Sequence, residues 1–233
     1  MENNKWVPSD KMSKKRYLAA AAQLHDGRLM VTGGNNITIY LNSSEIYGEE
    51  KWESKVPALP VTFYAHCLVT VNSTTVIAIG GKQNERTSGK TYYFTFGEES
   101  WTEGPEMKFK KHGQSCGKIR RNKDSQEMSI IVAGGAYGND YLSSVEILDS
   151  GSNEWRTGPE LPSTSVFSKM VEDQKGGVVL IGGYYPSNPS PDALYQLPHG
   201  GQDAVWTKME QKLKIGRQSH TAFLVPDSSV DCS

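Results

Sequence analysis

The stretch Ser129-Ile130-Ile131-Val132-Ala133-Gly134-Gly135 decides the fold of this chain. It is a short run of apolar, mostly β-branched residues that stops at two glycines, a pattern typical of a buried β-strand followed by a sharp turn. Three similar runs end at the glycine pairs Gly33-Gly34, Gly80-Gly81 and Gly182-Gly183. Recurrence of this kind indicates a repeat protein.

Tryptophans recur with the same spacing as the glycine pairs. They stand at Trp6, Trp52, Trp101, Trp155 and Trp206, and their spacing, like that of the glycine pairs, is about 50 residues. Two unrelated residue types therefore share one period, and each unit of the repeat contains one glycine pair followed by one tryptophan.

Each unit is predicted to contain four β-strands. In the second unit these are Phe63–Val71, Val76–Ile79, Thr91–Phe96 and the neighbourhood of Trp101, with turn residues between the third and fourth strands. A single four-stranded unit cannot bury both of its faces. The units are therefore expected to stack around an axis as the blades of a β-propeller.

The glycines and tryptophans are interpreted as structural residues. A glycine pair at the end of an inner strand suits a sharp turn where neighbouring blades approach closely. A tryptophan can fill the gap between two blades while its indole N–H bonds a backbone carbonyl. Neither marker indicates chemistry.

The pattern resembles that of kelch repeats, in which an apolar strand ending in Gly-Gly is followed by a strand of small and aromatic residues and then by Trp. The best matches are Leu142–Leu148 leading to Trp155, and Asn42–Tyr47 leading to Trp52. The second and fourth units depart from the pattern in the third strand. The resemblance implies a role in recognition as a substrate adaptor, in the cytoskeleton or outside the cell.

The predicted fold class is all-β: a kelch-type β-propeller with four full blades and partial strands at both termini, either an incomplete ring or a fragment of a five- or six-bladed propeller. A lone fourth strand is expected at Trp6 and a lone first strand over Arg217–Val225. Within one propeller region, 1–233, the approximate units are 1–12 (partial), 13–58, 59–107, 108–161, 162–212 and 213–233 (partial).

Composition narrows the class of partner and the compartment. The formal net charge of −1 disfavours nucleic acid, and apolar runs are far too short to insert in a membrane as helices. Three cysteines favour buried thiols over a disulfide framework. The chain as given is expected in the cytoplasm. Three glycosylation sequons, beginning at Asn36, Asn42 and Asn72, keep an extracellular location open if an N-terminal segment is missing.

The loops after the second strand are the predicted binding site. They are long and unlike one another, and they should emerge on the same face as the loops between blades. We expect them to bind a protein or peptide partner through Asn35, Arg86, Tyr137, Asn139, Tyr141, Tyr184 and Tyr185. Basic residues in the sequences Lys14-Lys15-Arg16 and Lys108-Phe109-Lys110-Lys111-His112 would favour an acidic peptide.

Catalysis has little support in the sequence. The five histidines lie in different units without metal-ligand spacing, so no catalytic residue, metal site or cofactor is predicted. His66 and His220 occupy corresponding positions, which favours a structural role. A copper enzyme domain of the galactose-oxidase type shares the propeller and stands as the alternative function. The preferred prediction is a non-catalytic interaction module.

Overall fold

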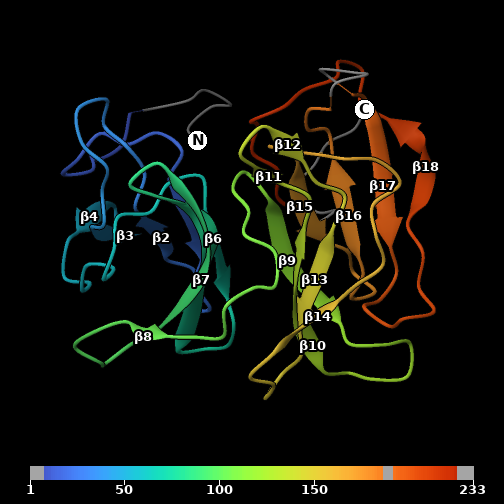
Figure 1. Cartoon of the computed structure of the whole chain (residues 1–233). Coiled ribbons are helices and arrows are strands. Elements are labelled where there is room, and N and C mark those ends of the chain that lie inside the picture. Colours follow the sequence, from blue (N-terminus) through green and yellow to red (C-terminus); the bar gives the residue numbers. More distant parts are fainter. Residues whose placement is uncertain (1–7, 186–190, 225–233) are drawn as a thin grey trace.

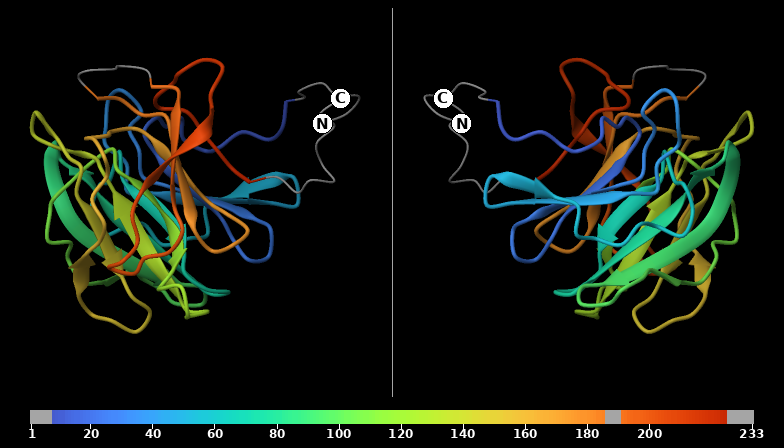
Figure 2. Two further views of the ribbon diagram at one scale, coloured as in Figure 1. Left: turned by 90° about the vertical axis from the view of Figure 1, so that its right-hand side faces the viewer. Right: turned by 90° about the vertical axis from the view of Figure 1, so that its left-hand side faces the viewer.

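The computed structural model describes residues 8–185 and 191–224, and every regular element in this part of the chain is a β-strand (Figure 1). Four antiparallel sheets of four strands form four blades, as the sequence predicts. Blades one and two lie on the left of Figure 1 and blades three and four on the right, and the side views of Figure 2 show the sheets at different tilts.

The strands follow one another within each blade in chain order. Blade one contains β1 (Ala20–Gln23), β2 (Leu29–Thr32), β3 (Ser44–Gly48) and β4 (Lys51–Glu53). Blade two contains β5 (Cys67–Thr70), β6 (Thr75–Gln83), β7 (Arg86–Thr95) and β8 (Thr102–Glu103). Blade three contains β9 (Ser115–Arg120), β10 (Met128–Ala133), β13 (Val145–Leu148) and β14 (Trp155–Thr157), with β11 (Ala136–Tyr137) and β12 (Asp140–Tyr141) as a separate hairpin. Blade four contains β15 (Lys169–Glu172), β16 (Val178–Ile181), β17 (Ala193–Leu197) and β18 (Thr207–Lys212).

The strands of blade two differ from their predicted bounds. The first strand begins at Cys67 rather than Phe63, because Ala65 adopts a left-handed backbone conformation with φ of 50° that interrupts an extended strand. The second and third strands run past the glycine pair as one long hairpin, with a register shift between Ile79 and Gly81. The bulge allows the ladder to continue where the other blades stop.

Three apolar layers between blades make up the core. Blade one packs Met30 and Ile46 against Val76, Phe94 and Trp101 of blade two. Corresponding layers join blade two to blade three around Trp155, and blade three to blade four around Trp206.

The tryptophans occupy these layers as predicted. The indole N–H groups of Trp101, Trp155 and Trp206 donate to the carbonyls of Pro57, Pro105 and Pro159, each at 2.9 Å. Each proline belongs to the segment that joins the preceding blade to the blade carrying the tryptophan.

The glycine pairs lie where neighbouring blades approach most closely. A Cβ built on Gly134 would lie 2.2 Å from the Ser165 carbonyl oxygen, so only glycine fits. The N–H of Gly135 donates to that carbonyl at 2.7 Å. Gly34, Gly81 and Gly183 bond the carbonyls of Phe63, Lys111 and Arg217 in the same way.

A ladder of backbone hydrogen bonds runs around the propeller axis. Five residues at corresponding positions adopt left-handed conformations with φ between 50° and 65°: Leu18, Ala65, Gly113, Phe167 and Ser219. Each of the last four donates its N–H to the carbonyl of the one before it, at 2.7–2.9 Å. Each blade is thereby tied to the next through main-chain atoms.

The cysteines correct one expectation. Cys67 and Cys116 form a disulfide, with a Cα–Cα distance of 6.2 Å, instead of remaining buried thiols. They lie on β5 and β9, the innermost strands of adjacent blades. Neighbouring blades bring these strands into contact, so two cysteines far apart in sequence come within disulfide range.

Of the two strands predicted at the termini, only the C-terminal one can be compared with the structure. Trp6 lies outside the described residues. Residues 217–224 form no strand in the described part of the chain, but they follow the path of an inter-blade segment because Arg217 accepts the bond from Gly183 and Ser219 ends the axial ladder. No helix of the described residues is long and apolar enough to span a bilayer.

Candidate functional site

One face of the propeller is built from the loops after the glycine pairs and from the linkers between blades. In each blade these two segments are joined by an antiparallel bridge: Tyr17 with Asn35, Tyr64 with Lys82, His112 with Ala136, and Val166 with Tyr184. We call this surface the loop face. It lies at the top of Figure 1, where β11 and β12 are labelled.

The predicted site residues have different surroundings on the loop face. Arg86, Tyr137 and Asn139 are exposed, the first at the start of β7 and the others in the β11–β12 hairpin. Asn35 is buried, and its Oδ1 accepts a hydrogen bond from the N–H of Ile37 at 2.7 Å. It shapes its own loop. Tyr185 is half-buried beside a small cavity within blade four.

Tyrosines from adjacent blades pair across the loop face. The rings of Tyr141 and Tyr184 lie 5.2 Å apart at a tilt of 56°, so the structure brings these two predicted residues together. Tyr40 stacks on Tyr64 with centroids 4.8 Å apart and nearly parallel planes, and the Tyr40 hydroxyl donates to Glu85. That bond raises the pKa of Tyr40.

The Tyr40–Tyr64 pair was not among the predicted site residues. Tyr40 lies in a predicted loop, whereas the sequence pattern predicts Tyr64 inside the strand Phe63–Val71. Its position immediately before the left-handed Ala65 places it in an inter-blade linker instead. Aligning the linkers of the four units with one another would have exposed this correspondence.

Exposed apolar side chains gather on the loop face. Tyr17, Leu18, Ile37, Ile39, Phe109 and Tyr137 are between 39% and 87% exposed, and all belong to these loops and linkers. Isolated exposed apolar residues are ordinary on protein surfaces, whereas these six share one face of the propeller.

The predicted basic patch is smaller than the sequence indicates. Lys14, Lys15, Lys108 and Lys110 are exposed. The side chain of Arg16 is 1% exposed and pairs with Glu45, and that of Lys111 is 0% exposed and pairs with Glu146 at 3.2 Å. Each cation is bonded to the blade that follows its own linker, Arg16 to blade one and Lys111 to blade three, and is not available to a partner.

A cavity of about 200 Å³ opens at the axis, lined by residues of all four blades. His66 and Gln114 line it at corresponding positions, and both are nine-tenths buried. The ring of His66 bonds the hydroxyl of Thr32 in blade one through Nε2 at 2.8 Å. Burial lowers the pKa of His66 to about 3, so the ring is neutral at physiological pH.

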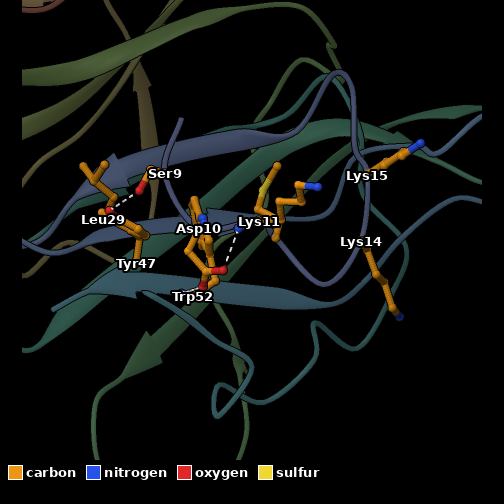
Figure 3. A pocket seen from close by; sticks show the side chains of 9 residues that line it. Ser9, Asp10, Lys11, Lys14, Lys15, Leu29, Tyr47 and Trp52 are labelled. Carbon is orange, nitrogen blue, oxygen red and sulfur yellow. Dashed lines mark hydrogen bonds between the residues drawn. The ribbon is translucent and has the colours of Figure 1, made fainter. Parts of the chain in front are cut away.

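A larger pocket of about 600 Å³ lies on blade one, away from the axis (Figure 3). Leu29, Tyr47 and Trp52 form its apolar wall, and Asp10 accepts the backbone N–H of Trp52 at 3.0 Å. In blades two to four the corresponding tryptophans are buried beneath the preceding blade. The pocket on blade one therefore corresponds to the surface that packs against the preceding blade in blades two to four. The equivalent positions of the tryptophans in the repeat did not predict that Trp52 lines an open pocket.

No group of three or more His, Cys, Asp or Glu side chains in the described ranges could hold a metal ion. His66 and His220 take equivalent places, since a Cβ on Gly33 or Gly182 would lie 2.9 Å from the respective ring. Both rings pack against a glycine pair, and the copper-oxidase alternative gains no support from these side chains.

Comparisons with known proteins agree with this architecture. The kelch motif model matches residues 129–162. Human kelch repeat and BTB domain-containing protein 12 is 26% identical over 184 residues, which cover 70% of this chain and 28% of that protein. The solved structure of YjhT has a TM-score of 0.72 and 13% identity, with coverage of 90% of this chain and 73% of YjhT. Together these findings support a kelch-repeat β-propeller.

Proposed function

We propose that this kelch-repeat β-propeller is a non-catalytic interaction module that binds an acidic segment of a protein or peptide on its loop face. Propellers built of kelch repeats generally mediate protein interactions. The observation that carries the proposal is the combination of exposed aromatic, aliphatic and lysine side chains on one face of a frame held by main-chain hydrogen bonds.

The frame supports binding because it fixes the loops before a partner arrives. The bridges fix the start of each loop to a linker, and the axial ladder fixes the linkers to one another. Tyr137 projects from the short β11–β12 hairpin and is 53% exposed. A rigidly held tyrosine contributes a large contact area at a small cost in conformational entropy.

The charges of the loop face favour an acidic partner. The exposed basic residues of its loops and linkers are Lys11, Lys14, Lys15, Lys55, Arg86, Lys108, Lys110, Lys214 and Arg217, and the exposed acidic residues are Asp10, Glu85, Glu106, Asp140 and Glu160. The chain as a whole is nearly neutral, so this excess of positive charge is local. An acidic segment would gain both electrostatic steering and contact with the tyrosines.

Binding of a labelled glutamate–tyrosine copolymer, measured by fluorescence anisotropy, tests the proposal. We expect Tyr137→Ala combined with Arg86→Ala to raise Kd about tenfold, since hot-spot truncations cost more than about 1 kcal/mol. Affinity should also fall as salt rises. A lysine–tyrosine copolymer is the matched probe and should bind weakly.

Two variants on the opposite face serve as controls. Val205→Ser and Lys123→Ala alter exposed residues in hairpins far from the loop face and should leave Kd unchanged. Equal losses from loop-face and control variants would contradict the proposal, as would tighter binding of the basic copolymer. Melting temperatures of all variants should match that of the wild type.

A further inference from the structure

The three glycosylation sequons have different surroundings. A sequon offers the side-chain amide nitrogen of asparagine as acceptor and requires a hydroxyl two residues later. A folded protein carries the attached glycan only at its surface, because the glycan is bulky and hydrated. The positions of Asn36, Asn42 and Asn72 therefore decide which sequon a folded chain could use.

We propose that Asn72 is an N-linked glycan acceptor and that Asn42 is not. Asn72 lies exposed at the tip of the hairpin between β5 and β6. Its Oδ1 accepts hydrogen bonds from the N–H of Thr74 at 2.9 Å and from the Thr74 hydroxyl at 3.2 Å. The turn thus holds the required hydroxyl against the amide, and Nδ2 takes part in no hydrogen bond among the described residues.

The modification forms a single bond at this nitrogen. Nδ2 of Asn72 loses one proton and bonds the anomeric carbon of the sugar. The bond between that carbon and the oxygen of a lipid-linked diphosphate breaks, and the diphosphate leaves with the bonding electrons. The donor is a polyprenyl-diphosphate oligosaccharide, and no oxidation or reduction takes place.

Asn42 lacks the freedom that Asn72 has. Its Nδ2 donates to the carbonyl of Leu59 at 3.0 Å, which ties the loop before β3 of blade one to the following linker. The serine of this sequon, Ser44, is 2% exposed within β3. A glycan at Asn42 would have to occupy the space between two packed segments.

Asn36 is an intermediate case. Its Oδ1 accepts from the Thr38 hydroxyl at 2.9 Å and from the N–H of Ile39 at 3.0 Å, which resembles the turn at Asn72. Asn36 is half-buried, however, and lies on the loop face, where a glycan would cover Ile37 and Ile39. The proposal therefore rests on Asn72, whose hairpin lies on the opposite face and leaves the loop face open.

The disulfide is an independent observation that favours the same compartment. Cys67 and Cys116 are joined between blades two and three, and disulfides form and persist chiefly in oxidising environments such as the secretory pathway. N-linked glycans are added in that pathway. Asn72 follows Cys67 by one short strand, so one blade carries both features.

Site-specific mass spectrometry tests the proposal. The full chain is expressed behind a secretory leader in insect or mammalian cells, digested without reduction, and compared before and after removal of N-glycans. We expect a glycan on the peptide containing Asn72, none on the peptide containing Asn42, and a Cys67–Cys116 cross-linked peptide. Asn72→Gln and Thr74→Val should each abolish the glycan, while Asn42→Gln should not change the pattern.

Chain isolated from its own organism completes the experiment. Conversion of Asn72 to aspartate after enzymatic glycan removal would support the proposal. An unmodified Asn72 in that material would overturn it, and so would a glycan on Asn42 or free thiols at Cys67 and Cys116. The melting temperature of Asn72→Gln should match that of the unglycosylated wild type, which separates loss of the acceptor from misfolding.

Discussion

Blades two and three fill one equivalent position in opposite ways. In blade three Lys111, from the linker, pairs with Glu146 on β13, and both side chains are fully buried. In blade two the same places hold Phe63 and Tyr92, whose rings meet edge to face at 5.7 Å. The propeller therefore accepts either a buried ion pair or an aromatic pair between the linker and the third strand.

The two blades also differ at a third position, the linker residue whose backbone N–H faces the third strand. Glu146 also accepts the backbone N–H of Lys108 at 2.7 Å, and Glu45 of blade one accepts that of Ser13 in the same way. Blades two and four have proline there, Pro60 and Pro162, which has no N–H to donate. A glutamate in the third strand thus occurs together with a linker that can satisfy it.

The largest expected effect comes from removing one partner of the ion pair. Glu146→Ala leaves the Lys111 ammonium buried without a counter-charge, and burial already lowers the pKa of Lys111. We expect the free energy of unfolding to fall by about 3–5 kcal/mol in chemical denaturation. Glu103→Ala, which breaks the exposed pair with Lys90, is the control and should cost at most about 1 kcal/mol. Equal costs would show that burial does not distinguish the two pairs.

Transplanting the aromatic pair should restore what Glu146→Ala loses. The triple variant Lys108→Pro, Lys111→Phe and Glu146→Tyr gives blade three the residues of blade two. Replacing a buried ion pair with well-packed apolar groups is neutral or stabilising by about 1–4 kcal/mol. We expect the triple variant to unfold at or above the wild-type denaturant concentration. A triple variant as unstable as Glu146→Ala would mean that the surroundings of the two blades are not interchangeable.

The smallest expected effect is on the pH dependence of stability, through His66, the residue after Ala65 of the axial ladder. His66 of blade two has a folded pKa of about 3, well below the value near 6.5 of an unfolded histidine. Between these values the unfolded chain binds a proton that the folded chain does not, so stability falls as pH falls, by up to about 1.4 kcal/mol per pH unit. His66→Gln, which copies Gln114 of blade three, should flatten the dependence of unfolding free energy on pH between 7 and 5.

The reverse change checks the same point. Gln114→His places a titratable ring in blade three at the equivalent axial position. It should make the loss of stability on acidification steeper than in the wild type. An unchanged slope in both variants would show that neither axial position senses pH.

The fold was predictable because its signal is local and repeated. Gly135 and Trp155 mark a close approach and an inter-blade gap, which only glycine and a large aromatic residue satisfy, and the structure places both as expected. The strand of blade two was misplaced because nothing in Ala65 signals a left-handed backbone. That conformation comes from the axial ladder, which is a tertiary feature.

The candidate site was harder to predict because exposure depends on partners distant in sequence. The sequence alone predicts Arg16 and Lys111 as surface cations. In the structure each is buried in an ion pair with a glutamate distant in sequence, Glu45 or Glu146. The sequence predicts Tyr141 and Tyr184 in two separate loops, and only the packing of adjacent blades brings their rings together. The disulfide was missed for the same reason.

The axial ladder has a consequence for how such a chain can grow. Leucine, alanine, glycine, phenylalanine and serine all take the same left-handed place in it, and each is held by amide and carbonyl groups that every one of these residues carries. A newly duplicated blade would therefore bring its own attachment to its neighbour, whatever side chain it had at that place. Sequence divergence between blades would leave these backbone hydrogen bonds intact. Duplication of a whole blade would therefore require no compensating substitution in the adjacent blade.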